Sequence, residues 1–200
     1  MGAAWVRCGG GARLDVLRQA ARGLAALHAR RICHRDIKSH NVVIALRSGG
    51  SGGGGSGDGS AWVAKIADLG SAAVLDGSGR VTGEVGTSGW SAPEVFSGGP
   101  YGAACDVFSC GVMVWEAAGA WGVPDNPLCG VTEEEYVLEL AGGARPPVQA
   151  RNCYGLSADA YGALLRRTWA QDPAARPTAA ELERELAELV RGLRGAGRGG

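Results

Sequence analysis

Carboxylates, an amide and one lysine gather in two short segments of this sequence. The first segment, His-Arg-Asp-Ile-Lys-Ser-His-Asn, contains Asp36, Lys38 and Asn41. The second, Asp-Leu-Gly, begins at Asp68. Magnesium in proteins is bound by a few hard oxygen atoms, and phosphate oxygens complete its shell. The residue types and their order therefore predict chemistry on a magnesium-bound phosphate, which needs positioning and neutralisation of charge more than covalent help.

A third motif, Ala-Pro-Glu, ends at Glu94 and follows the other two in the order found in protein kinases. A single Asp or Asn in a loop is most often a turn former, but three ordered motifs rarely arise by chance. Two later stretches extend the likeness: the apolar run that opens at Asp106, and Trp-Ala-Gln-Asp-Pro-Ala-Ala-Arg-Pro, which ends at Pro177. The sequence therefore resembles the catalytic half of a protein kinase over residues 12–193.

The resemblance implies a role for each residue of the first two motifs. Asp36 would accept or orient the proton of the substrate hydroxyl, and Lys38 would direct its charge toward the transferred phosphate. Thr87 would brace both of them, as the matching Thr does in Ser/Thr-specific kinases. Asn41 and Asp68 would be the metal ligands. The implied cofactors are ATP and Mg²⁺, and the residues that would contact them are Lys38, Asn41 and Asp68.

Three further positions match supporting residues of the family. His34 would pack beneath the catalytic loop, and Gly70 would let the chain turn without a side-chain clash. Arg35 would pair with a phosphate on the activation segment, residues 68–94. The residue that carries this phosphate stays open, because the segment holds several hydroxyls: Ser71, Ser78, Thr82, Thr87, Ser88 and Ser91.

Buried polar contacts are expected to hold these loops in place. Asp106 matches the family residue that accepts hydrogen bonds from the backbone at the His-Arg pair of the first motif. Glu94 and Arg176 match the partners of a buried ion pair, in which loss of one partner leaves the other charge buried. Trp90 would help to line the pocket for the substrate residue that follows the acceptor.

Apolar periodicity predicts a mainly α fold. A helix is expected at residues 12–31, where apolar residues recur at spacings of three and four. Strands are expected at 41–46 and 62–67, which would form a short β-hairpin at the catalytic loop. Further helices are expected at 103–118, 132–141, 157–170 and 178–193, with polar N-terminal caps at Thr132, Ser157 and Thr178. This helical bundle with a short hairpin resembles the C-terminal lobe of the protein-kinase fold.

The sequence before His34 shows neither the glycine-rich lid nor the strand-borne lysine of a kinase N-terminal β lobe. We expect that lobe to be absent, with residues 1–11 as a remnant of the connection between lobes. Residues 48–60 are almost entirely Gly and Ser, a composition that predicts a flexible loop. No Val-Ala-x-Lys follows this loop, so we do not interpret it as phosphate-binding. Residues 194–200 are expected to form a disordered tail.

Composition argues against several other classes of protein. The formal net charge is zero, so bulk electrostatics favours neither a nucleic acid nor a membrane as partner. No apolar run reaches transmembrane length, and no signal peptide is evident. The six cysteines show no Cys-x-x-Cys spacing, which favours reduced thiols in the cytoplasm or the nucleus over a zinc site or a disulfide framework. His28 and His40 have no evident partner and are interpreted as ordinary surface or core residues.

Two interpretations of function remain. Lys38 two residues after Asp36 is the Ser/Thr-kinase pattern, and the later motifs resemble the tyrosine-kinase-like group of these enzymes. The resemblance then implies transfer of the ATP γ-phosphate to a Ser or Thr of a protein substrate, with the chain alone inactive for lack of the N-terminal lobe. The alternative is a non-catalytic kinase-like scaffold or binding module. The identity of the substrate and the oligomeric state stay open.

Overall fold

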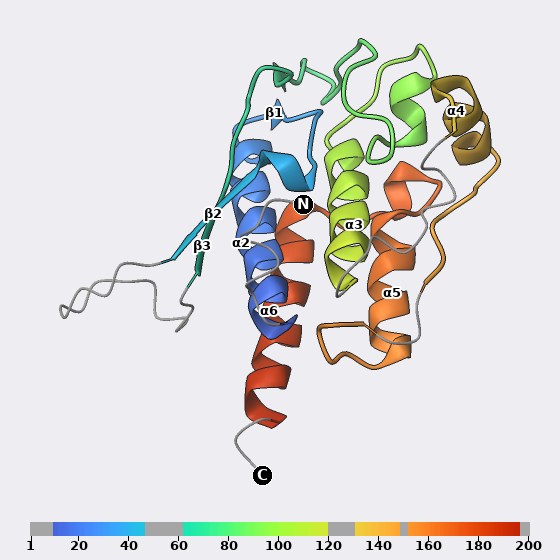
Figure 1. Cartoon of the computed structure of the whole chain (residues 1–200). Coiled ribbons are helices and arrows are strands. Elements are labelled where there is room, and N and C mark those ends of the chain that lie inside the picture. Colours follow the sequence, from blue (N-terminus) through green and yellow to red (C-terminus); the bar gives the residue numbers. More distant parts are fainter. Residues whose placement is uncertain (1–9, 47–61, 120–130, 149–151, 197–200) are drawn as a thin grey trace.

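The computed structural model describes residues 10–46, 62–119, 131–148 and 152–196 (Figure 1). These residues contain five α-helices: α2 (Gly10–His28), α3 (Ala104–Ala118), α4 (Glu133–Ala141), α5 (Ala158–Thr168) and α6 (Ala179–Ala196). The predicted helices are confirmed, with their ends displaced by a few residues. No described helix is both long and apolar enough to cross a membrane.

Parts of the predicted domain organisation fall outside the described residues. The Gly/Ser segment 48–60 lies there entirely, as do residues 1–9 of the expected remnant. Helix α6 continues to Ala196, so the first three residues of the expected tail are helical, and residues 197–200 are not described.

Helix α3 lies at the centre of the bundle, between the α2–α6 pair and α5 (Figure 1). Every residue from Cys105 to Ala118 is buried, as expected for a helix that is apolar on all sides. Helix α2 packs most extensively against α6, from the opposite end of the chain. The core is therefore built around α3, and any polar side chain on this helix needs a partner inside the protein.

Helix α2 buries the predicted apolar positions Leu14, Leu17, Ala21 and Leu24. Its burial is wider than one face near the start, because all of residues 13–18 are buried. It ends at His28, three residues earlier than expected. Arg31 explains the difference, because its φ of 60° is a left-handed conformation that an α-helix does not accommodate. The chain turns there and enters the catalytic loop.

Two small antiparallel ribbons frame that loop. Strand β2 (Val42–Leu46) pairs with β3 (Trp62–Ile66), which confirms the predicted hairpin. Strand β1 (Ile32–Cys33) pairs with β4 (Ala73–Val74). The second ribbon was not expected, because strands of two residues are too short to show a periodic pattern.

The β2–β3 ribbon is fixed to α2 by the side chain of Gln19. Its Nε2 donates to Trp62 O (3.1 Å), and its Oε1 accepts from Ala64 N (3.0 Å). One amide therefore pairs with the backbone as a neighbouring strand would. This contact sets the position of β3, which leads directly to Asp68.

The predicted helix caps are present. Thr132 Oγ1 accepts from Glu135 N (3.3 Å), and Glu135 Oε2 accepts from Thr132 N (2.8 Å). Thr178 and Glu181 form the same reciprocal pair before α6. Ser157 Oγ accepts from the third backbone N–H after it. These bonds satisfy N–H groups that the first helical turn leaves without partners.

Close packing between α3 and α5 makes Gly111 a sensitive position. A Cβ atom there would lie 2.3 Å from Thr168 Oγ1, and Thr168 is fully buried. We expect Gly111→Ala to lower the free energy of unfolding by about 1–3 kcal/mol through overpacking. Gly192→Ala is the matched control, because no atom lies within 4 Å of the position of its added Cβ. This substitution should stabilise α6 by about 0.5–1 kcal/mol. Urea unfolding followed by circular dichroism measures both; equal tolerance would contradict the α3–α5 contact.

Candidate active site

Asp36, Lys38 and Thr87 form a closed triangle of hydrogen bonds. Thr87 Oγ1 donates to Asp36 Oδ1 (2.6 Å), while Lys38 Nζ donates to Asp36 Oδ2 (2.8 Å) and to Thr87 Oγ1 (2.7 Å). Asp36 and Lys38 come from the loop between β1 and β2, and Thr87 comes from the segment after β4. The structure therefore brings together three residues that the sequence analysis assigned to one site.

The triangle keeps Asp36 in its charged form. Partial burial alone would raise the pKa of this carboxyl group, but hydrogen bonds from Lys38 and Thr87, with the lysine charge, outweigh burial and lower the pKa. The carboxylate can therefore orient a hydroxyl by accepting its hydrogen bond. The ammonium group of Lys38 lies beside it as the local positive charge.

Asn41 joins the same cluster through its amide nitrogen. Its Nδ2 donates to Asp36 O (2.8 Å) and Asp36 Oδ2 (3.1 Å). The side chain is buried, so these bonds fix its orientation. With the nitrogen engaged in this way, Oδ1 is the atom that Asn41 can offer to a cation.

Asp68 lies at the neighbouring end of the hairpin. Ala67 N donates to Asn41 O (2.8 Å), which extends the β2–β3 pairing by one residue and brings the following Asp68 beside the catalytic loop. Its carboxylate is exposed and accepts from Gly70 N (3.2 Å). No hydrogen bond joins the Asp68 side chain to Asp36 or Asn41 in the described residues.

Two residues of the Asp-Leu-Gly region have restricted geometry. Asp68 has a φ of 62°, an uncommon backbone conformation for a residue with a side chain. A Cβ on Gly70 would lie 3.1 Å from Asp68 Oδ1, which crowds the hydrogen-bonded carboxylate. His34 contacts the residue before Asp68, with its Nε2 3.1 Å from Ala67 O.

Asp106 anchors the catalytic loop from the first turn of α3. Its Oδ2 accepts from His34 N (2.9 Å), and its Oδ1 accepts from Arg35 N (2.8 Å). His28 Nε2 lies 2.8 Å from Oδ2, a partner for His28 that the sequence analysis did not identify. Asp106 was expected to bind the backbone of the loop, but no pattern in the sequence links it to His28, which lies far from it in the chain. Arg35 has a φ of 68°, and the carboxylate holds this strained turn.

Arg35 points its guanidinium group at the activation segment. Its Nε donates to Ser71 O (2.6 Å), and its Nη1 donates to Thr82 O (3.0 Å). The described structure therefore places a permanent positive charge against the exposed residue Thr82.

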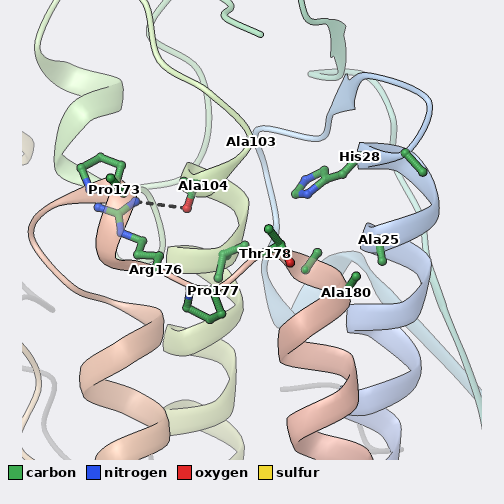
Figure 2. Close-up of a pocket in the computed structure, with 13 residues that line it drawn as sticks. Ala25, His28, Ala103, Ala104, Pro173, Arg176, Pro177, Thr178 and Ala180 are labelled. Carbon is green, nitrogen blue, oxygen red and sulfur yellow. Dashed lines mark hydrogen bonds between the residues drawn. The ribbon is translucent and has the colours of Figure 1, made fainter.

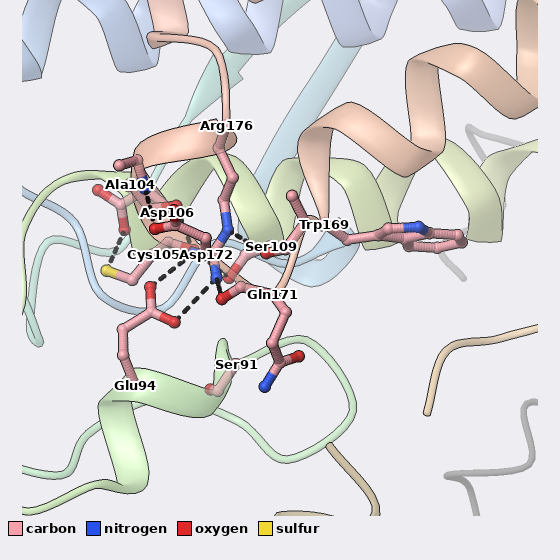
Figure 3. A network of polar contacts seen from close by, with 12 residues as sticks. Ser91, Glu94, Ala104, Cys105, Asp106, Ser109, Trp169, Gln171, Asp172 and Arg176 are labelled. Carbon is pink, nitrogen blue, oxygen red and sulfur yellow. Dashed lines mark hydrogen bonds and ion pairs between the residues drawn. The ribbon is translucent and has the colours of Figure 1, made fainter. Parts of the chain in front are cut away.

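Glu94 and Arg176 form the predicted ion pair. The Nη1–Oε1 distance is 2.5 Å and the Nη2–Oε2 distance is 2.9 Å, and Figure 3 shows the two side chains facing each other. The Arg176 side chain is fully buried and also donates to Ala170 O and Ala104 O. The pair thus ties the end of the activation segment to α3 and to the segment before α6.

Glu116 is a further buried carboxylate that the sequence analysis did not assign to the site. It accepts from Ser39 Oγ (2.9 Å) in the catalytic loop and from Trp90 Nε1 (3.1 Å) in the activation segment. A charged residue late in a strongly apolar run was the available signal, because a buried charge requires partners. His40, for which the sequence analysis identified no partner, makes an edge-on contact with the Trp90 ring at 6.0 Å between centroids.

Two thiols lie beside Asp106. Cys33 Sγ is 3.5 Å from Cys105 Sγ and 3.3 Å from Asp106 Oδ2, close enough for the three residues to hold a metal ion. Metal binding would require thiolates, whereas the hydrogen bond to Cys33 and burial raise the pKa of Cys105 well above its ordinary value. Asp106 is already occupied by its backbone donors. We therefore interpret the cluster as packed side chains and not as a metal site.

A groove of about 520 Å³ lies apart from these residues, between α2, the start of α3 and the segment before α6 (Figure 2). Most of its lining is alanine and proline, and His28 and Arg176 also border it. Asp36, Lys38 and Asn41 do not line it. The groove therefore does not belong to the polar cluster described above.

Replacing Asp106 should disrupt the loop anchor. In Asp106→Asn the amide NH₂ would face a backbone donor, so we expect the free energy of unfolding to fall by about 3 kcal/mol. Asp172→Asn is the control, because Asp172 caps a short helix and Asn caps equally well. Chemical unfolding at pH 7 compares them; equal stabilities would contradict the anchoring role.

The same carboxylate gives a pH dependence. Burial pushes the pKa of Asp106 upward, but His28 and the backbone N–H groups of His34 and Arg35 bring it below 3.8. Because the folded pKa is depressed, the contribution to stability is complete above pH 3.8 and is lost as pH falls through the folded value. We expect the unfolding free energy of Asp106→Asn to decline less steeply with acidification than that of the unchanged protein.

Comparison of the sequence with known proteins identifies the family of this chain. The sequence profile of the protein kinase domain matches residues 12–185. Serine/threonine-protein kinase STY17 of Arabidopsis thaliana is 33% identical over 178 residues, which cover 89% of this chain and 27% of that protein. Human mitogen-activated protein kinase kinase kinase 7 is 31% identical over 183 residues, which cover 89% of this chain and 26% of that protein. The chain thus spans about a quarter of the length of the curated relatives it matches. The order of the motifs, the anchored catalytic loop and the extent of the match together show that the chain belongs to the protein kinase family.

Proposed function

We propose that the chain is the C-terminal lobe of a Ser/Thr protein kinase and transfers the γ-phosphate of ATP to a hydroxyl of a protein substrate. The contact among Asp36, Lys38 and Thr87 carries this proposal. A carboxylate, an ammonium group and a hydroxyl held within 3 Å of one another suit a reaction that depends on positioning and charge.

Each member of the triangle has a distinct role in the proposal. The Asp36 carboxylate accepts the hydrogen bond of the substrate hydroxyl and orients it for attack. Lys38 neutralises charge on the transferred phosphate. Thr87 holds the other two in register through its own hydroxyl. A Thr at this position and a Lys two residues after Asp36 favour Ser/Thr acceptors, as the resemblance implies.

The donor set fits magnesium and the phosphates of ATP. Asn41 offers a neutral oxygen and Asp68 an anionic one, at adjacent ends of the β2–β3 ribbon, and magnesium prefers such hard ligands. Bound magnesium would neutralise phosphate charge. Asn41 and Asp68 would hold it, Lys38 would contact the phosphate, and Asp36 would remain free to orient the acceptor.

Exposed apolar side chains near these ligands support the assignment to a C-terminal lobe. Val43 is 58% exposed and Leu69 is 55% exposed, each adjacent in sequence to the segments that carry Asn41 and Asp68. Apolar surface beside a polar site is typical of an interface. We propose that an N-terminal β lobe covers this surface and completes the ATP site.

Kinase activity is testable with and without such a lobe. We expect the 200-residue chain to transfer little ³²P from labelled ATP to a generic protein substrate, and a chain extended by a kinase N-terminal lobe to be active. In the extended chain, Asp36→Asn and Asp68→Ala should each lower kcat at least about 100-fold. Asp159→Ala, at an exposed position in α5, should change nothing. An inert extended chain would favour the scaffold interpretation, and full activity of the two site variants would contradict the assigned roles.

Arg35 is proposed to bind a phosphate on Thr82. Thr82 is exposed, and its carbonyl already contacts the guanidinium group. Among the other hydroxyls of the segment, Thr87 is engaged by Asp36, Ser91 is buried, and Ser78 and Ser88 donate to the carboxylates of Asp76 and Glu133. Ser71 also contacts Arg35 through its carbonyl, but it is less exposed than Thr82.

Phosphorus NMR tests this pairing directly. A nearby guanidinium favours the dianion, so phosphoserine installed at position 82 should have a second pKa below its usual value of about 6. Phosphoserine at position 78 is the matched control and should not shift downward, because Asp76 lies beside it. The downward shift at 82 should disappear in Arg35→Ala; a shift that survives this change would contradict the proposal.

A further inference from the structure

Glu116 is an unusual residue for its place in the fold. It lies in the last turn of α3 and is 5% exposed. Burial raises the pKa of this carboxyl group, although hydrogen bonds from Ser39 and Trp90 oppose the rise. A buried carboxylate needs hydrogen-bond partners, and the position of these partners indicates what the residue does.

The two partners of Glu116 belong to different halves of the site. Ser39 follows Lys38 directly in the catalytic loop. Trp90 lies three residues after Thr87, and its backbone N donates to Thr87 O (3.1 Å). One carboxylate therefore joins the segment that carries Lys38 to the segment that carries Thr87, in addition to the direct hydrogen bonds that Thr87 makes with Asp36 and Lys38.

Helix α3 holds Trp90 at two points. Ser109 Oγ donates to Trp90 O (2.8 Å), and Glu116 accepts from the indole nitrogen. Ser109 and Glu116 are seven residues apart and so lie on the same face of the helix. The helix thereby acts as a rigid frame for both loops.

We propose that Glu116 is a positioning residue that sets the separation between the catalytic loop and the activation segment, and thereby the contact between Lys38 and Thr87. This inference rests on the proposed function only for its catalytic consequence. The mechanical link itself is a property of the isolated chain and can be measured without any activity.

The link predicts that a substitution on one loop alters the hydrogen exchange of the other loop. Ser39 makes its hydrogen bond to Glu116 and not to Trp90, so Ser39→Ala removes one side of the link and leaves the direct contacts of Lys38 with Thr87 and of His40 with Trp90 in place. Glu116→Gln should preserve the link, because its amide can donate to the Ser39 hydroxyl and accept from the indole N–H. Glu116→Ala should break it.

Hydrogen exchange with mass spectrometry on the 200-residue chain tests the inference. In Glu116→Ala we expect amide exchange at least tenfold faster in both residues 36–42 and residues 87–92, with the middle of α3 unchanged. Glu116→Gln should stay within about twofold of the unchanged protein, and Ser39→Ala should accelerate residues 87–92. Glu185→Ala, which removes an exposed ion pair with Arg167, is the control and should alter neither loop.

Several results would overturn the inference. Equal loosening of α3 and the loops in Glu116→Ala would mean a general packing role, and unchanged loops would mean no link. If Glu116→Ala does not fold, an unchanged activation segment in Ser39→Ala is sufficient to refute it. In the lobe-extended kinase, Glu116→Ala should lower kcat at least tenfold with an unchanged KM for ATP. If the lobe-extended kinase has no activity, the proposed function is contradicted. The hydrogen-exchange result on the isolated chain is not affected by that outcome.

Discussion

The acceptance of backbone hydrogen bonds by Asp106 is the constraint on which the rest of the site depends. Two consecutive N–H groups of the catalytic loop, at His34 and Arg35, converge on one buried carboxylate, and His28 adds a third contact. Such a group costs free energy to bury unless every oxygen is paired. Because α3 is itself buried on all sides, the hydrogen bonds to Asp106 fix the catalytic loop to the rigid core. They thereby hold Asp36 in a defined position.

Much of this arrangement could be predicted from the sequence because its signals are local. Apolar periodicity located α2, a continuously apolar run located α3, Thr-x-x-Glu patterns located two caps, and short β-branched runs located the β2–β3 ribbon. The contact of Asp36 and Lys38 with Thr87 was also expected, because the resemblance to Ser/Thr kinases implies that Thr87 braces both residues. Asp68 was placed at the correct end of the ribbon, but a role for its carboxylate stays a prediction.

The remainder depended on contacts between residues far apart in the chain. His28 with Asp106, and Glu116 with Ser39 and Trp90, are single polar pairs without a repeating pattern. The β1–β4 ribbon is too short to show alternation. The proximity of Cys33 to Cys105 likewise depends on how β1 meets α3. In each case the tertiary fold chooses the partner, and composition or spacing carries no trace of that choice.

The pairing of α2 with α6 has a consequence for biosynthesis. The first described helix packs mainly against the last one, so its apolar face has no proper cover while the ribosome is still translating the intervening chain. Contacts of such long sequence separation form slowly, and exposed apolar surface during that interval invites aggregation. The core between α2 and α6 can therefore close only after α6 has been synthesised, which leaves the apolar side of α2 exposed for longer than in a helix that packs against its neighbour in sequence.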